Sequence, residues 1–165
     1  MQTILIKGRG AVNFLARSSF DHYPDGMASS ATYILDEQIG FLLRRVTQRH
    51  LAIFSEAIPQ VTTTQYAVLG RLAERGPQSQ NQLGRATAMD AATIKGVVDR
   101  LEREGLLSTS ADLEDRRRLT ISLTEAGIAL FETHLADALA ISRKTLEPLT
   151  KAEQAQLMAL LLRLT

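Results

Sequence analysis

Residues 90–124 have the sequence DAATIKGVVDRLEREGLLSTSADLEDRRRLTISLT, which combines a helix pattern with two strand-like runs. Asp90 can cap a helix, because its carboxylate accepts hydrogen bonds from the backbone N–H groups of the first turn. Gly105 can end the same helix in the left-handed conformation that other residues avoid. We therefore predict a short helix between Asp90 and Gly105 with both of its ends marked.

Two β-like runs follow this helix. Residues 106–109 and 119–123 have strand composition, and the second run alternates apolar and polar side chains. Residues 112–118 lie between them and carry three adjacent arginines, which are too polar to be core. The pattern predicts an antiparallel hairpin with an Arg-rich tip beside a helix, which is the order of a winged helix that reads DNA.

Two helices are predicted upstream. The first runs from about 35 to 57 and ends before Pro59, since proline cannot continue a helix. The second runs from Thr63 or Thr64 to Glu74. The apolar stripe of the first helix is Leu35, Ile39, Leu42, Leu43, Val46, Ile53 and Ala57. The inner face of the second is predicted to be Tyr66, Leu69, Leu72 and Ala73.

A third, short helix is predicted over residues 80–86, with Ser79 as its cap. A turn at 87–89 joins it to the helix that opens at Asp90, which gives a helix-turn-helix.

The C-terminal region is predicted to hold two more helices. One runs from Thr124 to about Lys144, and the other is opened by a capping box of Thr150 and Glu153. The predicted inner face of the longer helix is Ile128, Phe131, Leu135, Leu139 and Ser142. The apolar faces of the first and last helices either cover the core of their own chain or form a dimer interface, and periodicity alone does not separate the two.

These residues together resemble the MarR (multiple antibiotic resistance regulator) family. The matching pieces are TQYAVL at 64–69, QLG at 82–84, VDRLEREGL at 98–106, the DxxDRR pattern at 112–117 and the LTxxG pattern at 123–127. The resemblance is specific over about 63–127 and looser from about 35 to the C-terminus. Glu114 departs from the family pattern and makes the tip less positive.

The resemblance implies a mainly α domain over 31–165. It has a winged helix-turn-helix core at 63–123 with a small β-hairpin wing, flanked by dimerisation helices at 35–57 and 124–164. Residues 1–30 are interpreted as an extension without fixed structure, although their Arg and Ser content also faintly resembles an organellar transit peptide.

Composition limits the function. The chain has 165 residues, 45% of them hydrophobic, which suits a single domain without room for an enzyme domain. Its net charge of +1 means that any affinity for DNA must come from where the cations lie. The absence of cysteine excludes disulfides and thiol sensing. No apolar run is long enough for a membrane span, so we expect a cytoplasmic protein.

The candidate DNA contacts fall into three groups. Thr93 and Lys95 lie in the first turns of the reading helix and are predicted to meet base edges, whereas Arg100 is predicted to contact a phosphate. Arg116 is predicted to enter a minor groove and Arg117 to pair within the wing or contact the backbone. The predicted phosphate donors at the third helix are Ser79, Gln80 and Gln82. The alternatives are a solvated arginine loop and a winged helix that binds only protein.

His50 lies on the apolar stripe of the first helix and needs a polar partner there. One interpretation is a hydrogen-bonded histidine of the core or the dimer interface. The other is an effector site, implied by the family, in which Arg49 or His50 pairs with a carboxylate and Phe54 or Tyr66 stacks on a ring. The Arg and His pattern at 44–50 is similar to family members that control catabolism of aromatic or pyridine carboxylates.

No enzyme motif is present, and the three histidines lack the short spacing of a metal site, so we expect no catalysis, metal or cofactor. The combined hypothesis is a homodimeric repressor of a catabolic or efflux operon. It binds a pseudo-palindromic operator on double-stranded DNA and is released by a small aromatic acid or phenolic effector. The operator, the controlled genes, the effector and the choice between repression and activation stay open.

Overall fold

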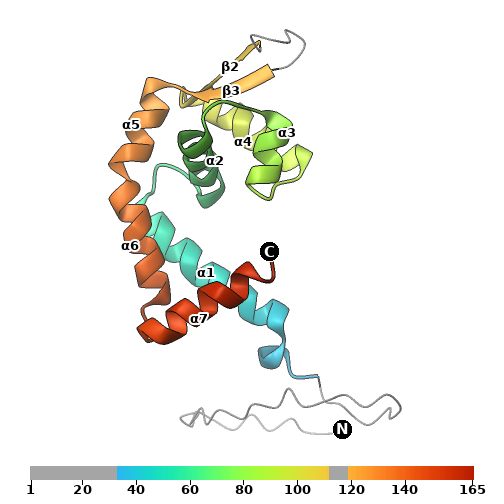
Figure 1. Cartoon of the computed structure of the whole chain (residues 1–165), viewed down its shortest axis with the longest axis vertical. Coiled ribbons are helices and arrows are strands. Elements are labelled where there is room, and N and C mark those ends of the chain that lie inside the picture. Colours follow the sequence, from blue (N-terminus) through green and yellow to red (C-terminus); the bar gives the residue numbers. More distant parts are fainter. Residues whose placement is uncertain (1–32, 112–118) are drawn as a thin grey trace, which may run out of the picture. The chain divides into compact units, whose positions relative to one another are not determined.

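The computed structural model describes residues 33–111 and 119–165 (Figure 1). Residues 35–165 form one compact unit, which is mainly helical with one small sheet. Its elements are a 3-10 helix η1 (Leu35–Glu37), α1 (Ile39–Ala57), α2 (Thr63–Arg75), β1 (Gln78–Ser79), α3 (Gln80–Ala86), α4 (Ala91–Arg103), β2 (Leu107–Ala111), β3 (Leu119–Leu123), α5 (Glu125–Thr133), α6 (Leu135–Leu146) and α7 (Lys151–Leu162). The predicted fold class is confirmed.

The structure contains the helix caps that the sequence predicts at Ser79, Asp90, Gly105 and Thr150. The Asp90 carboxylate accepts the Thr93 backbone N–H at 2.7 Å, and Gly105 adopts a φ of 71° just after α4. Ser79 and Thr150 both form complete capping boxes, at the starts of α3 and α7. These short-range interactions mark the starts of α3, α4 and α7.

The sheet has the strand order β1-β3-β2, and both pairings are antiparallel. The predicted hairpin is confirmed, with Ser108 opposite Ser122 in the register of β2 and β3. The sequence did not predict β1, because its two residues, Gln78 and Ser79, are polar and too few to show a period. The hairpin tip at 112–118 lies outside the described residues.

The core of the winged region lies where α2, α3, α4 and the sheet meet. Its most deeply buried side chains include Leu69, Leu83, Ile94, Leu101 and Ile121. Ile94, Val98 and Leu101 form the inner face of α4, and Val97 is half-buried against the same core.

The inner face of α2 is partly different from the prediction. Tyr66, Leu69 and Leu72 are buried, but Ala73 is exposed, and Val68 and Gln65 are buried instead. An alanine carries little apolar surface, so its position on the stripe was a weak guide.

The single helix predicted from Thr124 to about Lys144 is wrong. The chain breaks between α5 and α6 at His134, whose φ of −98° and ψ of 7° leave the helical region. The His134 ring lies 2.9 Å from the Asp137 carboxylate, which is in the first turn of α6. Of the predicted inner face, Ile128, Leu135 and Leu139 are exposed, whereas Ile141 is the buried residue of α6.

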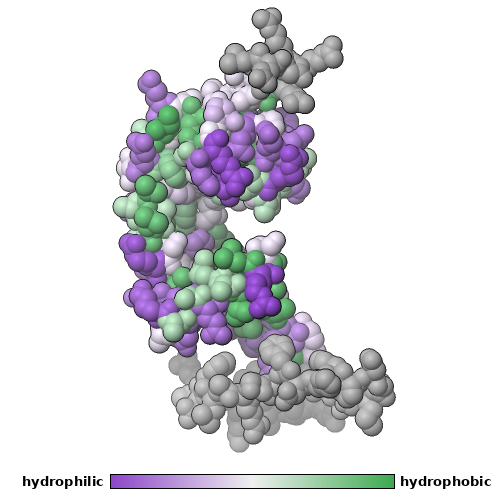
Figure 2. Space-filling view, viewed as in Figure 1, coloured by the Kyte–Doolittle hydropathy of each residue, from purple (hydrophilic) through white to green (hydrophobic). Residues whose placement is uncertain are grey.

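The flanking helices expose much apolar surface. No residue of α7 is buried, and Figure 2 shows hydrophobic side chains gathered over this helix. The large exposed apolar residues of α1, α6 and α7 are Ile39, Leu42, Leu43, Val46, Leu135, Leu139, Met158, Leu160 and Leu162. Within the described ranges, no helix has both the length and the hydropathy needed to cross a membrane.

Gly127 is required by packing. A Cβ at this position would overlap the Leu106 carbonyl oxygen, which lies where β2 begins. We expect Gly127→Ala to lower the free energy of unfolding by at least about 2 kcal/mol, because backbone atoms must move to accept the methyl group. Urea denaturation at a fixed protein concentration measures this change.

Gly96 provides the matched control. It is also in a helix, but a Cβ there meets no atom within 4 Å. Gly96→Ala should raise the free energy of unfolding by about 0.5–1 kcal/mol through helix propensity. Equal effects of the two substitutions would contradict the packing argument.

Candidate nucleic-acid interface

The face of α4 opposite the core is open to solvent. Because Ile94, Val98 and Leu101 turn inward, the helical period places Thr93, Lys95 and Gly96 on the outside, and all three are exposed. The Lys95 side chain is 64% exposed. Thr93 and Lys95, the two residues predicted to meet base edges, therefore both lie on the accessible face of α4.

Lys95 is paired along its own helix. Its ammonium group lies 3.1 and 2.9 Å from the two carboxylate oxygens of Asp99, one turn later. The pair is solvent-exposed, so it contributes little to stability and can open when another acceptor approaches. A base contact by Lys95 must compete with Asp99 for the ammonium hydrogens.

Arg100 is exposed at the edge of α4, where the sequence placed a phosphate contact. Among the described residues it has no side-chain partner, unlike Arg103, whose guanidinium donates to the Asp99 carbonyl at 3.2 Å. Its charge is therefore available to a polyanion.

The cap of α4 is electrostatically favourable. Hydrogen bonds from the Thr93 backbone N–H, then from the Thr93 side chain, lower the pKa of Asp90 below its usual range. A lowered pKa in the folded state means that this contribution is present at neutral pH and is lost as the pH falls through that pKa. A base contact by the Thr93 hydroxyl would compete with this cap.

The start of α3 gives the three predicted phosphate donors different roles. The Gln82 side-chain oxygen accepts from both the backbone N–H and the hydroxyl of Ser79, at 3.0 and 2.8 Å. The Ser79 hydroxyl hydrogen is therefore occupied, while the amide NH₂ of Gln82 is left to donate outward. Gln80, the first residue of α3, is half-buried beside them.

Arg85 was missed by the sequence prediction. It lies one turn after Gln82 on α3, and both residues line a surface pocket of about 890 Å³ between α3 and Thr120 of β3. The i, i+3 spacing from Gln82 was the only sequence signal for this cation. Arg116 and Arg117 of the predicted wing tip lie outside the described residues.

The residues predicted to bind an effector divide into two pairs. Arg49 and His50 reach from α1 to the C-terminal part of α6. The guanidinium of Arg49 donates to the Lys144 carbonyl at 3.2 Å, and Nδ1 of His50 lies 3.0 Å from the Thr145 hydroxyl. His50 thus has the polar partner that its half-buried position requires.

Phe54 and Tyr66 form an aromatic cluster with Phe131 of α5. The rings of Phe54 and Tyr66 meet edge to face at 5.8 Å, and Tyr66 and Phe131 are 5.3 Å apart. The Tyr66 hydroxyl donates to the Phe131 carbonyl at 3.3 Å. Burial, with a smaller effect from the Asp137 carboxylate, raises the pKa of Tyr66.

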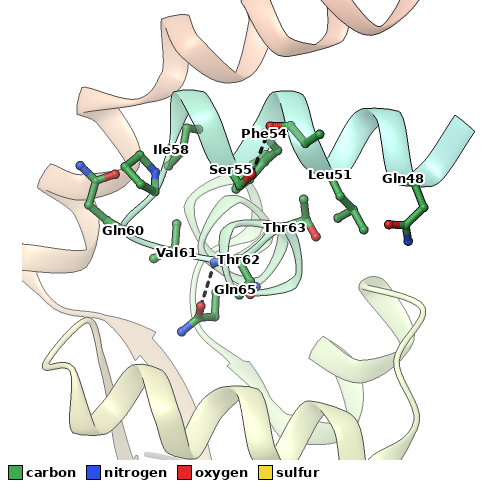
Figure 3. Close-up of a pocket in the computed structure, with 12 residues that line it drawn as sticks. Gln48, Leu51, Phe54, Ser55, Ile58, Gln60, Val61, Thr62, Thr63 and Gln65 are labelled. Carbon is green, nitrogen blue, oxygen red and sulfur yellow. Dashed lines mark hydrogen bonds between the residues drawn. The ribbon is translucent and has the colours of Figure 1, made fainter.

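A pocket of about 520 Å³ lies between α1, α2 and the loop that joins them (Figure 3). Of the four predicted effector residues only Phe54 lines it. The lining is Gln48, Leu51, Ala52, Phe54, Ser55, Ile58, Pro59, Gln60, Val61, Thr62, Thr63 and Gln65. No group of three or more acidic, His or Cys residues suited to a metal ion occurs in the described part of the chain.

The helix-turn-helix of α3 and α4, the hairpin beside it and the exposed face of α4 define a winged-helix transcriptional regulator. The chain belongs to the MarR family, whose profile matches residues 61–119. The predicted family is confirmed.

Three similar proteins set this membership in context. The transcriptional repressor NicR of Pseudomonas putida is 41% identical over 131 residues, which are 78% of this chain and 83% of NicR. A probable transcriptional regulator from Pseudomonas aeruginosa is 55% identical, with a TM-score of 0.78 over 80% of this chain and 100% of that one. BpsR of Bordetella bronchiseptica, whose DNA binding is regulated by 6-hydroxynicotinic acid, is 40% identical, with a TM-score of 0.77 over 81% of this chain and 96% of BpsR.

Two substitutions on α4 should separate base reading from phosphate contact. We expect Lys95→Ala to reduce the preference for operator over random DNA about tenfold, because base-edge contacts carry discrimination. Arg100→Ala should weaken binding to both DNAs alike and lower the slope of log K against log salt by about 1. Fluorescence anisotropy with both DNAs at several salt concentrations measures these effects.

The control is Lys151→Ala, which removes an exposed lysine at the start of α7. This substitution should change neither the preference for operator over random DNA nor the slope of log K against log salt. An unchanged preference in Lys95→Ala would show that this lysine does not read bases.

Proposed function

We propose that this protein is a sequence-specific, non-enzymatic DNA-binding regulator that represses transcription as a homodimer and is released by a small aromatic carboxylate. The observation that carries the proposal is the α4 surface, which is capped, held on its inner side by Ile94 and Leu101, and exposes Lys95 and Arg100 outward. Such a surface suits the major groove of double-stranded DNA. The bacterial relatives with this fold support a cytoplasmic site of action.

The dimer is proposed from the unpartnered helices. An apolar helix with no buried residue, such as α7, leaves hydrophobic area in water that a second chain would cover. The exposed apolar residues of α1, including Leu43 and Val46, extend this surface. A two-fold dimer presents two α4 helices to half-sites one helical turn apart, which fits a pseudo-palindromic operator.

The effector class is proposed from the relatives and from two side chains. BpsR responds to 6-hydroxynicotinic acid, a pyridine carboxylate. Here the Arg49 guanidinium and the His50 imidazole contact the adjacent residues Lys144 and Thr145 where α1 packs on α6, and two such groups suit a carboxylate. The same contacts support the alternative in which His50 only stabilises the packing of α1 on α6.

Release is proposed to occur by a population shift. A carboxylate that drew Arg49 and His50 away from Lys144 and Thr145 would loosen the packing of α1 on α6. If the loosened state separates the two α4 helices differently, the ligand lowers affinity for correctly spaced half-sites. The controlled operon would then encode catabolism or efflux of the same compound.

Titration of the full chain against DNA from upstream of its own gene tests the proposal. We expect binding of two chains per site, with log K falling linearly against log salt, because bound cations release counterions from phosphates. Analytical ultracentrifugation with labelled DNA gives the stoichiometry. Affinity that does not change with salt would exclude DNA recognition through phosphates.

The effector proposal is tested with His50→Ala. This variant should bind operator within about twofold of the unaltered protein, because the hydrogen bond of His50 is to α6 and not to α4. The 6-hydroxynicotinate concentration needed for half-release should rise about tenfold. Anisotropy at increasing ligand concentration measures the midpoint of release. A normal response in this variant would assign His50 a packing role only.

A further inference from the structure

The apolar core supports the β2–β3 hairpin at its base, beside α4 (Figure 1). Side chains alternate between the two faces of a strand, so Leu107 and Thr109 lie on the same face of β2. Leu107 is buried, and so is Ile121, which pairs with Thr109 across the sheet. The next pair outward on this face, Ala111 and Leu119, is exposed. In the described strands the core beneath the hairpin therefore ends at Thr109.

A carboxylate of α4 contacts the hairpin at this point. The Thr109 hydroxyl donates a hydrogen bond to the Glu102 carboxylate, across the turn at Gly105. Glu102 is half-buried in the last turn of α4. A hydrogen bond to an ionised acceptor is roughly twice as strong as one between neutral groups. The contact therefore restrains the direction in which β2 runs relative to α4.

The position of Glu102 is unfavourable for its own helix. The C-terminal end of a helix carries partial negative charge, which favours cations there and disfavours carboxylates. Arg100 and Arg103 follow this rule, whereas Glu102 and the C-cap Glu104 do not. Both carboxylates instead accept hydrogen bonds from other elements, Glu102 from the hairpin and Glu104 from the NH₂ group of Gln65 in α2 at 3.1 Å. Their role is therefore in tertiary contacts and not in the stability of α4 itself.

We propose that Glu102 is a positioning residue for the wing. Through Thr109 it holds the hairpin at a fixed angle to α4, and this angle lets the wing meet a minor groove while α4 occupies the adjoining major groove. Each strand residue beyond Thr109 lies about 3.3 Å further from the contact, so a rotation at Thr109 displaces the outer residues progressively more. The restraint on the hairpin does not depend on DNA, whereas its effect on DNA recognition rests on the proposed function.

Distances between spin labels on α4 and β2 test the restraint in the full chain without DNA. The chain has no cysteine, so Gly96→Cys and Ser110→Cys, at exposed positions, supply the two labelling sites. An excess of unlabelled chain ensures that label pairs within one chain dominate the signal. Glu102→Ala and Thr109→Val should each broaden the distance distribution, because the hairpin can then rotate about its base. The double variant should broaden it no further, since both substitutions remove the same bond.

Three control variants are measured with the same labels. Glu102→Gln keeps an acceptor and Thr109→Ser keeps a donor, so both should retain the narrow distribution. Glu104→Ala removes an equal charge from the same end of α4, but its carboxylate contacts α2 and not the hairpin, so it should also leave the distribution unchanged. An unaltered distribution in Thr109→Val, or equal broadening in Glu104→Ala, would overturn the proposal.

The effect on DNA is tested with the operator core placed between A·T-rich and G·C-rich flanks. A·T-rich flanks have the narrow minor groove that attracts arginine. Thr109→Val should reduce the preference for A·T-rich flanks about fivefold, as expected for one lost hydrogen bond, and should keep the preference for the operator core over a random core within about twofold. Lys95→Ala should do the reverse, and Thr109→Ser should change neither preference. Fluorescence anisotropy at a single salt concentration measures both preferences.

The two experiments distinguish failure of this proposal from failure of the proposed function. If the chain binds no DNA while Glu102→Ala and Thr109→Val broaden the label distances, the proposed function fails and the restraint on the hairpin stands. If the chain binds its operator without any preference between the flanks, the role of Glu102 in DNA recognition is refuted. Equal loss of both preferences in Thr109→Val would refute it as well, because general destabilisation of the winged core has that effect.

Discussion

The backbones of α5 and of the turn after α4 are in direct contact, and this contact joins the end of α4 to the hairpin and to the C-terminal helices. The Thr124 hydroxyl donates to the Gly105 carbonyl at 2.7 Å and accepts the Gly127 N–H at 3.1 Å, while the Thr124 N–H donates to the Leu106 carbonyl. The end of α4, the base of the β2–β3 hairpin and the start of α5 meet at this point. Only a glycine at 127 allows the backbones to approach so closely. This junction fixes α4 relative to α5, so a movement of α5 would be transmitted to the reading helix.

The sequence predicted most of the winged core because the signals there are local. The cap at Asp90 and the left-handed glycine at 105 each act within a few residues, and the structure has both. The alternation at 119–123 predicted the strand β3, in which Ile121 is buried but Leu119 is exposed. The break at His134 had no such signal, since apolar residues continue at helical spacing through it and neither glycine nor proline is present. The apolar face itself was found, but periodicity could not show that Leu135 and Leu139 face outward.

The candidate site residues also divide into those that local sequence signals could predict and those that they could not. Exposure of Thr93 and Lys95 followed from helical geometry once the inner face was known. The ion pair of Lys95 with Asp99 was also readable from its i, i+4 spacing, although the prediction did not use it. In contrast, the partners of Arg49 and His50 lie about 95 positions away in sequence, and the contact of Gln65 with Glu104 spans 39. Such contacts depend on how helices pack, which a single sequence does not specify.

Asp99 also bears on how such a protein would search a genome. If α4 enters the groove as proposed, the Asp99 carboxylate would repel phosphates and hold the Lys95 ammonium group, so a duplex without a suitable base edge would be bound more weakly. Together with a net charge of only +1, this would shorten residence on unrelated DNA if α4 binds DNA as proposed. In the proposed complex, Asp99 would therefore compete with the duplex for the Lys95 ammonium group and favour release from unrelated sequences.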